Sequence, residues 1–594
     1  MSKLLYANEK NILILVAALK AHGIKRVIAS PGTTNLAFVA SLQCDSFFEM
    51  FSCVDERSAA YMAVGMTEES GEPVVITCTG ATASRNYLSA LTEAYYRKLP
   101  ILVVTGTKDI NRTGQLHEQF IDRSVAQKDV LVSSYLLPSI HYGGDAITCE
   151  LRANQAINDL TKNGGGPVHI NLSTEYTRDY SVTELPKFRV IKRIGYDNID
   201  QAPDMPIGRI GVFVGSHATF SDNLTKAIDR FCASRDAVVF CDHTSGYYGK
   251  YKLNHSLVAV QSNYLSDLCT LDLCIHIGEI SGEYGCLSEK LKKRNVWRVN
   301  TDGVIRDLFG KMSYMFEITE TDFFNYYTLE ENGSEHIEFL TACKKEYSDI
   351  LSKAIDIPFS NVWIASQLAH RIPSGSSVHL GILNSLRTWN FFTFPTGVRS
   401  FCNVGGFGID GCLSSMLGAS YVFPDKLYFG IIGDLSFFYD MNSIGNRHVG
   451  NNVRLLVVNN GKGTEFRNFY HIGSMFGEDA DKYIAAGGHF GNKSKSLLKH
   501  YAEDLGYRYF SASNKEEFLQ YADSFVSPIV SESMIFEVFT NNEDESDAIY
   551  YMWNLVSNKK GVAANQSNKM EKKIQKIIGK KGIAILKIIL GRKQ

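Results

Sequence analysis

Residues 427–436 read LYFGIIGDLS, and this stretch decides the fold. An apolar run ends at Gly433-Asp434, and a segment of helical character follows directly. A strand this apolar, followed at once by a helix, is typical of a parallel sheet covered by helices on both faces. The turn also places free N–H groups and the positive end of a helix at the carboxyl edge of the sheet, where a diphosphate can bind.

The same alternation of apolar strands and helix-length segments recurs along the chain. A helix is expected over 11–21, before the first strand. Function in such sheets sits at the carboxyl ends of the strands. We therefore predict an α/β protein with three consecutive doubly wound parallel-sheet domains. The predicted strands lie at 26–30, 74–79, 101–106 and 168–173, then at 210–215, 237–242, 271–278 and 296–302, then at 376–382, 427–434, 453–460 and 534–540.

The expected domains are 1–182, 190–345 and 355–555, which we interpret as pyrimidine-binding, central Rossmann-like and diphosphate-binding. Residues 185–205 are polar and predicted to be an irregular linker. A tail at 556–594 differs in character: from Lys569 onward it carries nine basic residues against the single acid Glu571, with isoleucines at helical spacing. Such a cationic amphipathic segment can lie on a membrane surface, remain a solvated helix, or dock a partner.

Composition excludes several classes of function. The 594 residues carry 61 Lys and Arg against 63 Asp and Glu, a net charge of −2 that gives no general attraction to nucleic acid. The 12 cysteines form no CxxC pair and are expected to be reduced. The N-terminus lacks a signal-peptide pattern and no apolar run is long enough to span a bilayer. We expect a cytoplasmic protein, peripheral at the membrane if the tail binds there.

Two side chains near the deciding stretch have the chemistry of magnesium ligands. Asp434 ends one predicted strand, and Asn460, 26 positions later, ends the next one within VVNNGKG. Mg²⁺ takes about six oxygen ligands, with few from protein and several from phosphate and water. The carboxylate and the amide oxygen fit that requirement.

The stretch GDLSFFYDMNSIGNRHVGNNVRLLVVNN resembles the thiamine-diphosphate motif of the acetolactate synthase, pyruvate oxidase and pyruvate decarboxylase superfamily. The resemblance runs over about 1–550 and includes SPG (30–32), VDERSAAYMAVG (54–65), NSL (384–386) and NVGGFGIDG (403–411). DERSAA, NSL, GIDG and GDLSF together look most like the menaquinone-pathway SEPHCHC synthase family. The resemblance implies thiamine diphosphate and Mg²⁺ as cofactors.

The resemblance also implies roles for individual residues. Glu56 matches the glutamate that hydrogen-bonds N1′ of the aminopyrimidine, a contact that favours the imino tautomer and loss of the thiazolium C2 proton. Gln119 matches a glutamine over the reacting carbon, which makes these two the expected catalytic residues. Ile409 matches the apolar residue that holds the cofactor bent, and Lys462 would offer a backbone carbonyl to the metal. The other matched cofactor positions are Thr79, Asn86, Asn384, Ser385, Gly408, Gly433, Leu435 and Ser436.

In this superfamily the glutamate and the diphosphate site come from different subunits. The resemblance therefore implies a homodimer or homotetramer.

The sequence departs from SEPHCHC synthase at the positions that bind its anionic substrates. Thr34, Lys108 and Trp389 stand where that family has arginines, although Arg387 is close by. Each charge-assisted carboxylate contact is worth about 1.5–3 kcal/mol, so losing several disfavours a multiply anionic substrate. An acceptor rich in hydroxyl or amine groups, such as an activated sugar, would suit Thr34, Asn35, Trp389, Glu279 and Glu283. Lys108 and Arg387 are further candidate substrate residues.

The leading interpretation is a carboligase that decarboxylates a 2-oxo acid and adds the acyl anion equivalent to an acceptor. A decarboxylase that releases an aldehyde is one alternative, although the VTGTKDINRTG loop (104–114) lacks the histidines common in that branch. An FAD-containing oxidase is another, since one branch combines this architecture with a basic C-terminal helix. A catalytically inert cofactor-binding relative is the alternative from a different class.

Overall fold

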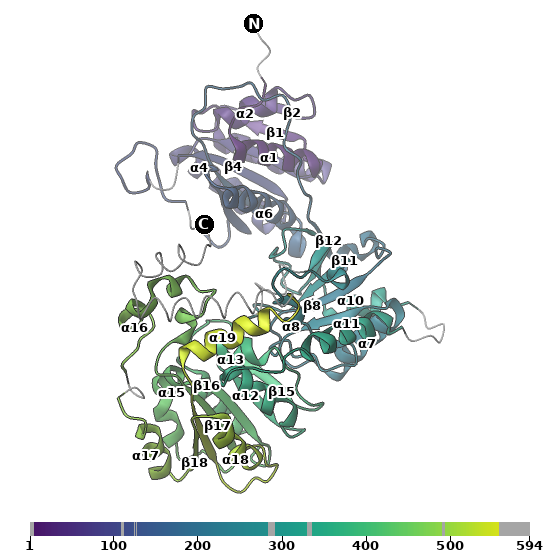
Figure 1. Cartoon of the computed structure of the whole chain (residues 1–594). Helices are drawn as coiled ribbons and strands as arrows, with labels where there is room; N and C mark the ends of the chain where they lie inside the picture. The colour runs from purple at the N-terminus through teal and green to yellow at the C-terminus, as the bar shows by residue number, and fades with distance from the viewer. Residues whose placement is uncertain are drawn as a thin grey trace, which may run out of the picture. The chain divides into compact units, whose positions relative to one another are not determined.

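The computed structural model describes residues 5–108, 112–123, 125, 127–282, 291–329, 336–489 and 493–557 (Figure 1). It confirms the predicted fold class, because the strands form three sheets built from parallel pairings. The chain divides into two compact units, Met1–Pro203 with Trp297–Ile318, and Asp204–Val296 with Thr319–Gln594. The three-domain boundaries stay a prediction. Nearly all of the basic tail, and Glu283, lie outside the described residues.

The first sheet has six strands in the order β2-β1-β3-β4-β6-β5. Successive residues of its central strands point to opposite faces, so that Leu102 and Val104 pack with α1 and α6 while Ile101 and Val103 pack with α3 and α5. The strands are β1 (Arg26–Ala29), β2 (Glu49–Ser52), β3 (Val74–Cys78), β4 (Ile101–Thr107), β5 (Ser133–Leu137) and β6 (Val168–Ser173). The helices are α1 (Lys10–Ala21), α2 (Leu36–Gln43), α3 (Glu56–Ser70), α4 (Ala81–Asn86), α5 (Leu88–Tyr96), α6 (Gly143–Asp159) and η2 (Lys162–Gly164).

The second sheet has seven strands in the order β10-β9-β8-β11-β12-β13-β7. From β10 to β13 this is the 3-2-1-4-5-6 order of dinucleotide-binding folds. Its strands are β7 (Lys192–Gly195), β8 (Ile210–Val214), β9 (Val238–Cys241), β10 (Lys252–Asn254), β11 (Thr270–Ile277), β12 (Lys292–Val299) and β13 (Met312–Glu317). Its helices are η3 (Tyr196–Gln201), α7 (Asp222–Arg235), α8 (Ser256–Ala259), η4 (Asp267–Cys269), α10 (Glu320–Tyr327) and α11 (Glu338–Leu351).

Strand β7 corrects one expectation. It lies inside the segment 185–205, which was predicted to be an irregular linker, and it pairs in parallel with β13. The strand is short and at the edge of the sheet, and its first two residues, Lys192 and Arg193, are polar. An edge strand of this composition carries no apolar run, which explains the error.

The third sheet repeats the topology of the first. Its order is β15-β14-β16-β17-β19-β18, which matches β2-β1-β3-β4-β6-β5 strand for strand. Its strands are β14 (Ser377–Leu380), β15 (Arg399–Cys402), β16 (Tyr428–Gly433), β17 (Val453–Asn459), β18 (Arg508–Ala512) and β19 (Met534–Phe539). Its helices are α12 (Asn361–Leu368), η5 (Ala369–Arg371), α13 (Asn384–Trp389), α14 (Cys412–Ser420), α15 (Asp434–Asp440), η6 (Met441–Gly445), η7 (Thr464–Arg467), η8 (Ile472–Asp479), α16 (Ala480–Tyr483), α17 (Leu497–Asp504), α18 (Lys515–Phe525) and α19 (Asn542–Trp553).

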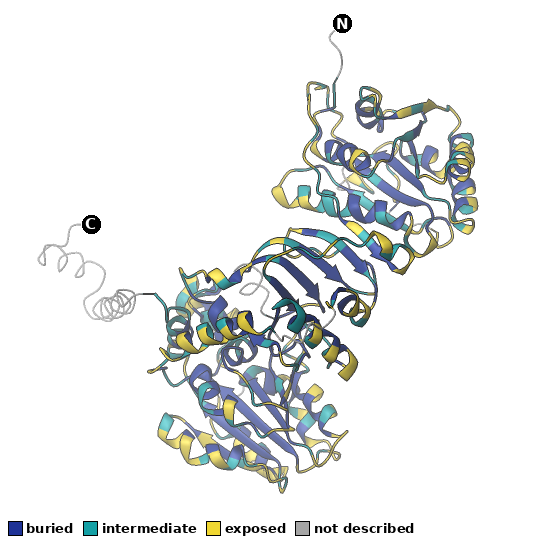
Figure 2. Cartoon of the chain, turned by 90° about the vertical axis from the view of Figure 1, so that its right-hand side faces the viewer, coloured by how far each residue is buried: buried dark blue, intermediate teal, exposed yellow. Residues whose placement is uncertain are grey.

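The strand order reverses between β1 and β3 in the first sheet, and between β14 and β16 in the third. Ligands of doubly wound sheets bind beside the carboxyl ends of the strands at such points. The central strands of each sheet are mostly buried, whereas many residues of the covering helices are exposed (Figure 2). No helix in the described ranges is long and apolar enough to cross a membrane.

Candidate active site

Glu56 begins helix α3, directly after β2. Asp55 caps this helix, and its carboxylate accepts the Ser58 N–H at 2.9 Å. Asn86 Nδ2, at the end of α4, donates to Glu56 Oε2 at 2.9 Å. The fold therefore brings together two residues, 30 positions apart, that were each predicted to contact the cofactor.

Thr34 lies in a tight packing arrangement at the first strand-order reversal. Its hydroxyl bonds the Thr79 hydroxyl and donates to the Gly106 carbonyl at 3.0 Å, and it accepts the Gly80 N–H at 3.2 Å. Only 7% of Thr34 is exposed. A Cβ on Gly106 would lie 2.2 Å from the Thr34 carbonyl oxygen, so only glycine allows this close approach. The Thr34 hydroxyl thus serves the packing of these loops, and a contact of Thr34 with substrate stays a prediction.

Lys108 directly follows β4, and Gln119 lies further along the same loop. Gln119 is exposed and adopts a left-handed backbone with φ +59°. Lys108 Nζ lies 2.9 Å from Glu118 Oε1, and the lysine also lines a cavity of about 420 Å³ with Phe120 and Arg152. The charge of Lys108 is thus already matched by a neighbouring carboxylate.

Asp434 and Asn460 lie at the carboxyl ends of the paired strands β16 and β17. Asp434 is 3% exposed and its Oδ2 accepts the Gly461 N–H at 3.1 Å. Burial raises the pKa of Asp434 to about 7. Asn460 Oδ1 is buried and has no hydrogen-bond partner in the described part of the chain. A buried carboxylate beside an unsatisfied amide oxygen fits the oxygen ligands that Mg²⁺ takes.

Thr464 links two of the predicted cofactor residues. The Asn384 amide lies 2.9 Å from Thr464 Oγ1, and Asn460 Nδ2 donates to the same oxygen at 3.3 Å. Ser385 is buried beside them, and its Oγ accepts from Asn361 Nδ2 at 3.4 Å. Thr464 was not predicted from the sequence, although its place four residues after Asn460 could have indicated it.

The GIDG loop is tied to the start of α15. Ser436 Oγ donates to the Ile409 carbonyl at 2.7 Å, which fixes Ile409 beside the residues that follow Gly433. The Ile409 side chain is half-buried against the core of the third sheet, Gly408 is exposed, and Leu435 is half-buried. The Lys462 ammonium group pairs with Asp481 at 2.6 Å. The predicted metal contact of Lys462 concerns its backbone carbonyl, which this ion pair does not involve.

The side chains of two other predicted substrate residues make their contacts with neighbouring residues of the protein. Arg387 forms an ion pair with the largely buried Glu465, and Tyr470 donates to the same carboxylate at 3.0 Å. Trp389 is fully buried, and its indole N–H donates to Asn361 Oδ1 at 3.0 Å. The Trp389 ring is part of the core, and its contact with substrate stays a prediction.

Left-handed backbone conformations border the predicted site residues. Ala81, Gln119, Leu383 and Phe407 all have positive φ, and Leu383 combines φ +70° with ψ −118°. A non-glycine residue in such a conformation costs of order 1–3 kcal/mol and tends to occur at functional sites. Leu383 precedes Asn384 and Phe407 precedes Gly408. This clustering independently favours the same two loops as a ligand site.

The three doubly wound sheets place the Glu56 carboxylate after β2, and the Asp434 and Asn460 oxygens after β16 and β17, an arrangement that resembles enzymes of the thiamine-diphosphate class. The family profile described as "Thiamine pyrophosphate enzyme, N-terminal TPP binding domain" matches residues 13–128. The chain is thus similar to thiamine-diphosphate-dependent enzymes.

Curated relatives cover nearly the whole chain. The 2-succinyl-5-enolpyruvyl-6-hydroxy-3-cyclohexene-1-carboxylate synthase of Phocaeicola vulgatus is 29% identical over 93% of this chain and 100% of its own length. The synthase of the same name from Bacteroides thetaiotaomicron is 29% identical over 91% of this chain and 98% of its own length. The one from Flavobacterium johnsoniae is 24% identical over 76% and 83%. That full name abbreviates to SEPHCHC synthase.

Proposed function

We propose that this enzyme uses thiamine diphosphate and Mg²⁺ to decarboxylate a 2-oxo acid and to join the acyl unit to an acceptor. The observation that carries the proposal is the buried Asp434 carboxylate beside the unsatisfied Asn460 oxygen. The names of the relatives, which are synthases, support ligation rather than simple aldehyde release.

The residues of the third sheet would hold the diphosphate end of the cofactor. Asp434, Asn460 and the Lys462 carbonyl would bind Mg²⁺, while Asn384, Ser385 and Ser436 would contact the phosphates. The N-terminus of α15 offers N–H groups to the same anion. The chemistry that thiamine diphosphate supplies when bound is a carbon nucleophile and an acceptor for the electrons released with CO₂.

The residues of the first sheet would serve the reacting end. Glu56 would hold a proton at its carboxyl oxygen toward the cofactor, and Asn86 keeps that carboxyl group in one orientation. Thr79 and Ile409 would contact the cofactor rings. Gln119, which lies on an exposed loop, would position the donor.

We propose that a complete site needs two protomers. Exposed apolar side chains lie on helix α3, which Glu56 begins, and just before it: Val54 is 78% exposed, Tyr61 47% and Met62 51%. Exposed apolar groups that gather on one surface are typical of an interface, and these residues support one here. Light scattering of the purified protein should give at least twice the 66.2 kDa chain mass.

The proposed acceptor differs from that of the relatives and is rich in hydroxyl or amine groups, such as an activated sugar. Lys108 and Arg387 are neutralised by Glu118 and Glu465, which makes them poor sites for a multiply charged acceptor. Thr34 supports the same conclusion, since its side chain adds no charge.

A screen of 2-oxo acids with thiamine diphosphate and Mg²⁺ tests the proposal. CO₂ release should depend on both cofactors. When an acceptor is added, the ligated product should form in place of the aldehyde. Release of aldehyde alone, whatever acceptor is present, would contradict the ligation step. No affinity for thiamine diphosphate in the presence of Mg²⁺ would overturn the whole proposal.

A further inference from the structure

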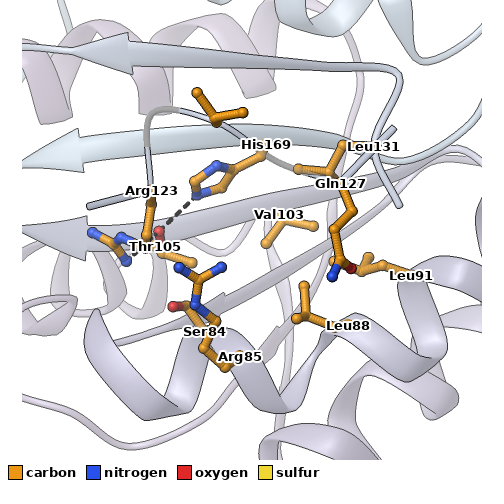
Figure 3. A pocket seen from close by; sticks show the side chains of 11 residues that line it. Ser84, Arg85, Leu88, Leu91, Val103, Thr105, Arg123, Gln127, Leu131 and His169 are labelled. Atoms are coloured by element: carbon orange, nitrogen blue, oxygen red, sulfur yellow. Dashed lines mark hydrogen bonds between the residues drawn. The ribbon is translucent and has the colours of Figure 1, made fainter. Parts of the chain in front are cut away.

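The last residue of helix α4, Asn86, donates a hydrogen bond to Glu56. The same helix also borders a separate cavity. This cavity has a volume of about 100 Å³ and lies among α4, α5 and the strands β4 and β6 (Figure 3). Its wall is apolar over Leu88, Leu91 and Val103. The polar side chains that face it include Arg85, Arg123, Thr105 and His169, and none of the described lining residues is acidic.

Arg123 is a buried cation that the protein surrounds with neutral groups. It is 8% exposed, and its guanidinium donates to Thr105 Oγ1 at 2.8 Å and to Asn171 Oδ1 at 2.7 Å. Its Nε is buried without a partner. No carboxylate pairs with it in the part of the chain that the structure describes. A desolvated charge without a counter-ion is costly, so an anion beside it would be strongly favoured.

Arg85 adds a second positive charge to the same wall. Among the described residues, it donates to the backbone carbonyl of Asp122 at 3.1 Å. Burial, together with the nearby Arg85, lowers the pKa of Arg123 to about 10. Both guanidinium groups still carry their charge at neutral pH. Two like charges that share a cavity leave a site for one anion between them.

His169 contributes no charge to the cavity. His169 Nε2 is hydrogen-bonded to Thr105 Oγ1 at 2.7 Å, and Thr105 Oγ1 also accepts from Arg123. The other ring nitrogen, Nδ1, is hydrogen-bonded to Ser134 Oγ at 2.9 Å. Burial lowers the pKa of His169 to about 3, which agrees with a neutral ring. The positive charge therefore comes from the two arginines.

We propose that this cavity is a binding site for a small carboxylate with a short apolar chain. The carboxylate would lie between Arg85 and Arg123, with the chain against Leu88, Leu91 and Val103. A cavity of 150 Å³ holds benzene and a water needs about 10–15 Å³, so this one suits a ligand of about four to six non-hydrogen atoms. The site is distinct from the Glu56 carboxyl group, which lies on α3.

Titration of the full-length protein with propionate, without thiamine diphosphate or Mg²⁺, tests the site by calorimetry. Propionate lacks the 2-oxo group that the proposed reaction needs, so this result does not depend on the proposed function. Wild-type protein should bind propionate, and Arg85→Ala should weaken binding about ten- to hundredfold, the value of a charge-assisted contact. Arg123→Gln should do the same, and the exposed Arg178→Ala is the matched control.

Inorganic phosphate separates the proposed ligand class from a general anion site. Propionate should bind more tightly than phosphate, because only propionate has a chain for the apolar wall. Equal or tighter phosphate binding would overturn the carboxylate assignment. Propionate binding that Arg85→Ala leaves unchanged, or no propionate binding by wild-type protein, would overturn the site itself. Arg85 is exposed, so its variant tests the site even if Arg123→Gln fails to fold.

Discussion

Asn86 Nδ2 lies 2.9 Å from Glu56 Oε2, and this hydrogen bond joins the end of α4 to the first residue of α3. The two helices follow different strands of the first sheet, on either side of a strand-order reversal. A side chain at a helix start is otherwise held only by its own rotamer preference. The amide therefore fixes the orientation of the carboxyl group on which the proposed chemistry depends.

Replacing Glu56 by Gln should separate cofactor binding from turnover. We expect a loss in kcat of about 10²–10⁴-fold, because the variant cannot hold or move a proton at that position. Affinity for thiamine diphosphate should change only a few-fold. CO₂ release and cofactor titration measure the two quantities. Glu69→Gln, an exposed carboxylate on the same helix, should leave both unchanged, and wild-type turnover by Glu56→Gln would remove Glu56 from the mechanism.

Replacing Asp434 by Asn should weaken Mg²⁺-dependent binding of thiamine diphosphate. The loss of one charged metal contact predicts a decrease in affinity of about ten- to hundredfold. The same variant should not destabilise the metal-free protein near neutral pH, since it removes a carboxylate whose ionisation burial opposes. Titrations at several Mg²⁺ concentrations measure the effect, with the exposed Asp425→Asn as control. Unchanged Mg²⁺ dependence would show that the metal binds elsewhere.

Glu545 should make the stability of the second unit depend on pH. It is buried on α19, accepts the Asn361 N–H at 3.0 Å and the Thr540 hydroxyl at 2.7 Å, and burial raises its pKa from 4.5 to about 7. The folded state therefore holds the proton more tightly than the unfolded state. This stabilisation is complete below pH 4.5 and is lost as the pH rises to about 7.

Glu545→Gln should remove this dependence, because the amide resembles the protonated acid. Relative to the variant, wild-type protein should lose up to about 3 kcal/mol of unfolding free energy between acidic and mildly alkaline pH. Denaturant titrations of both proteins across that range measure the difference. Parallel pH profiles would mean that Glu545 is ionised in the folded protein.

The Arg387–Glu465 pair should behave as a structural ion pair. Arg387→Met leaves the Glu465 carboxylate largely buried without its cation, and we expect a loss of about 1–3 kcal/mol because Arg387 is partly exposed. Adding Glu465→Gln should recover much of that loss. If Arg387 instead binds the donor carboxylate, the double variant regains stability but keeps a raised KM. Thermal unfolding and donor KM of the single and double variants separate these results.

The sequence predicted the central strands because they are buried on both faces. All seven residues of β17 are buried, which leaves an uninterrupted apolar run. The missed strands include the edge strands β2 and β18, where exposed residues interrupt the pattern. In the same way, the turn after β16 located Asp434, because a strand end and a helix start can both be recognised from local sequence.

Side-chain partners could not be predicted in the same way. Thr464 is hydrogen-bonded to Asn384, which is 80 positions away, and the buried Arg123 donates a hydrogen bond to Asn171 on β6. Such contacts depend on how the loops fold over the sheet edge. Trp389 was predicted to contact substrate because of its spacing from the NSL segment. Spacing alone does not distinguish a ring that points into the core from one that faces a ligand.

The close approach of Gly106 to Thr34 limits how this enzyme could be redesigned for other substrates. A long cationic side chain at position 34 would have to leave the hydrogen bonds to Thr79 and Gly80, which hold together the loops that follow three strands. A change of specificity here requires remodelling the loops as a group. A single substitution at position 34 would first change the conformation of these loops, and any effect on the choice of acceptor would follow from that change.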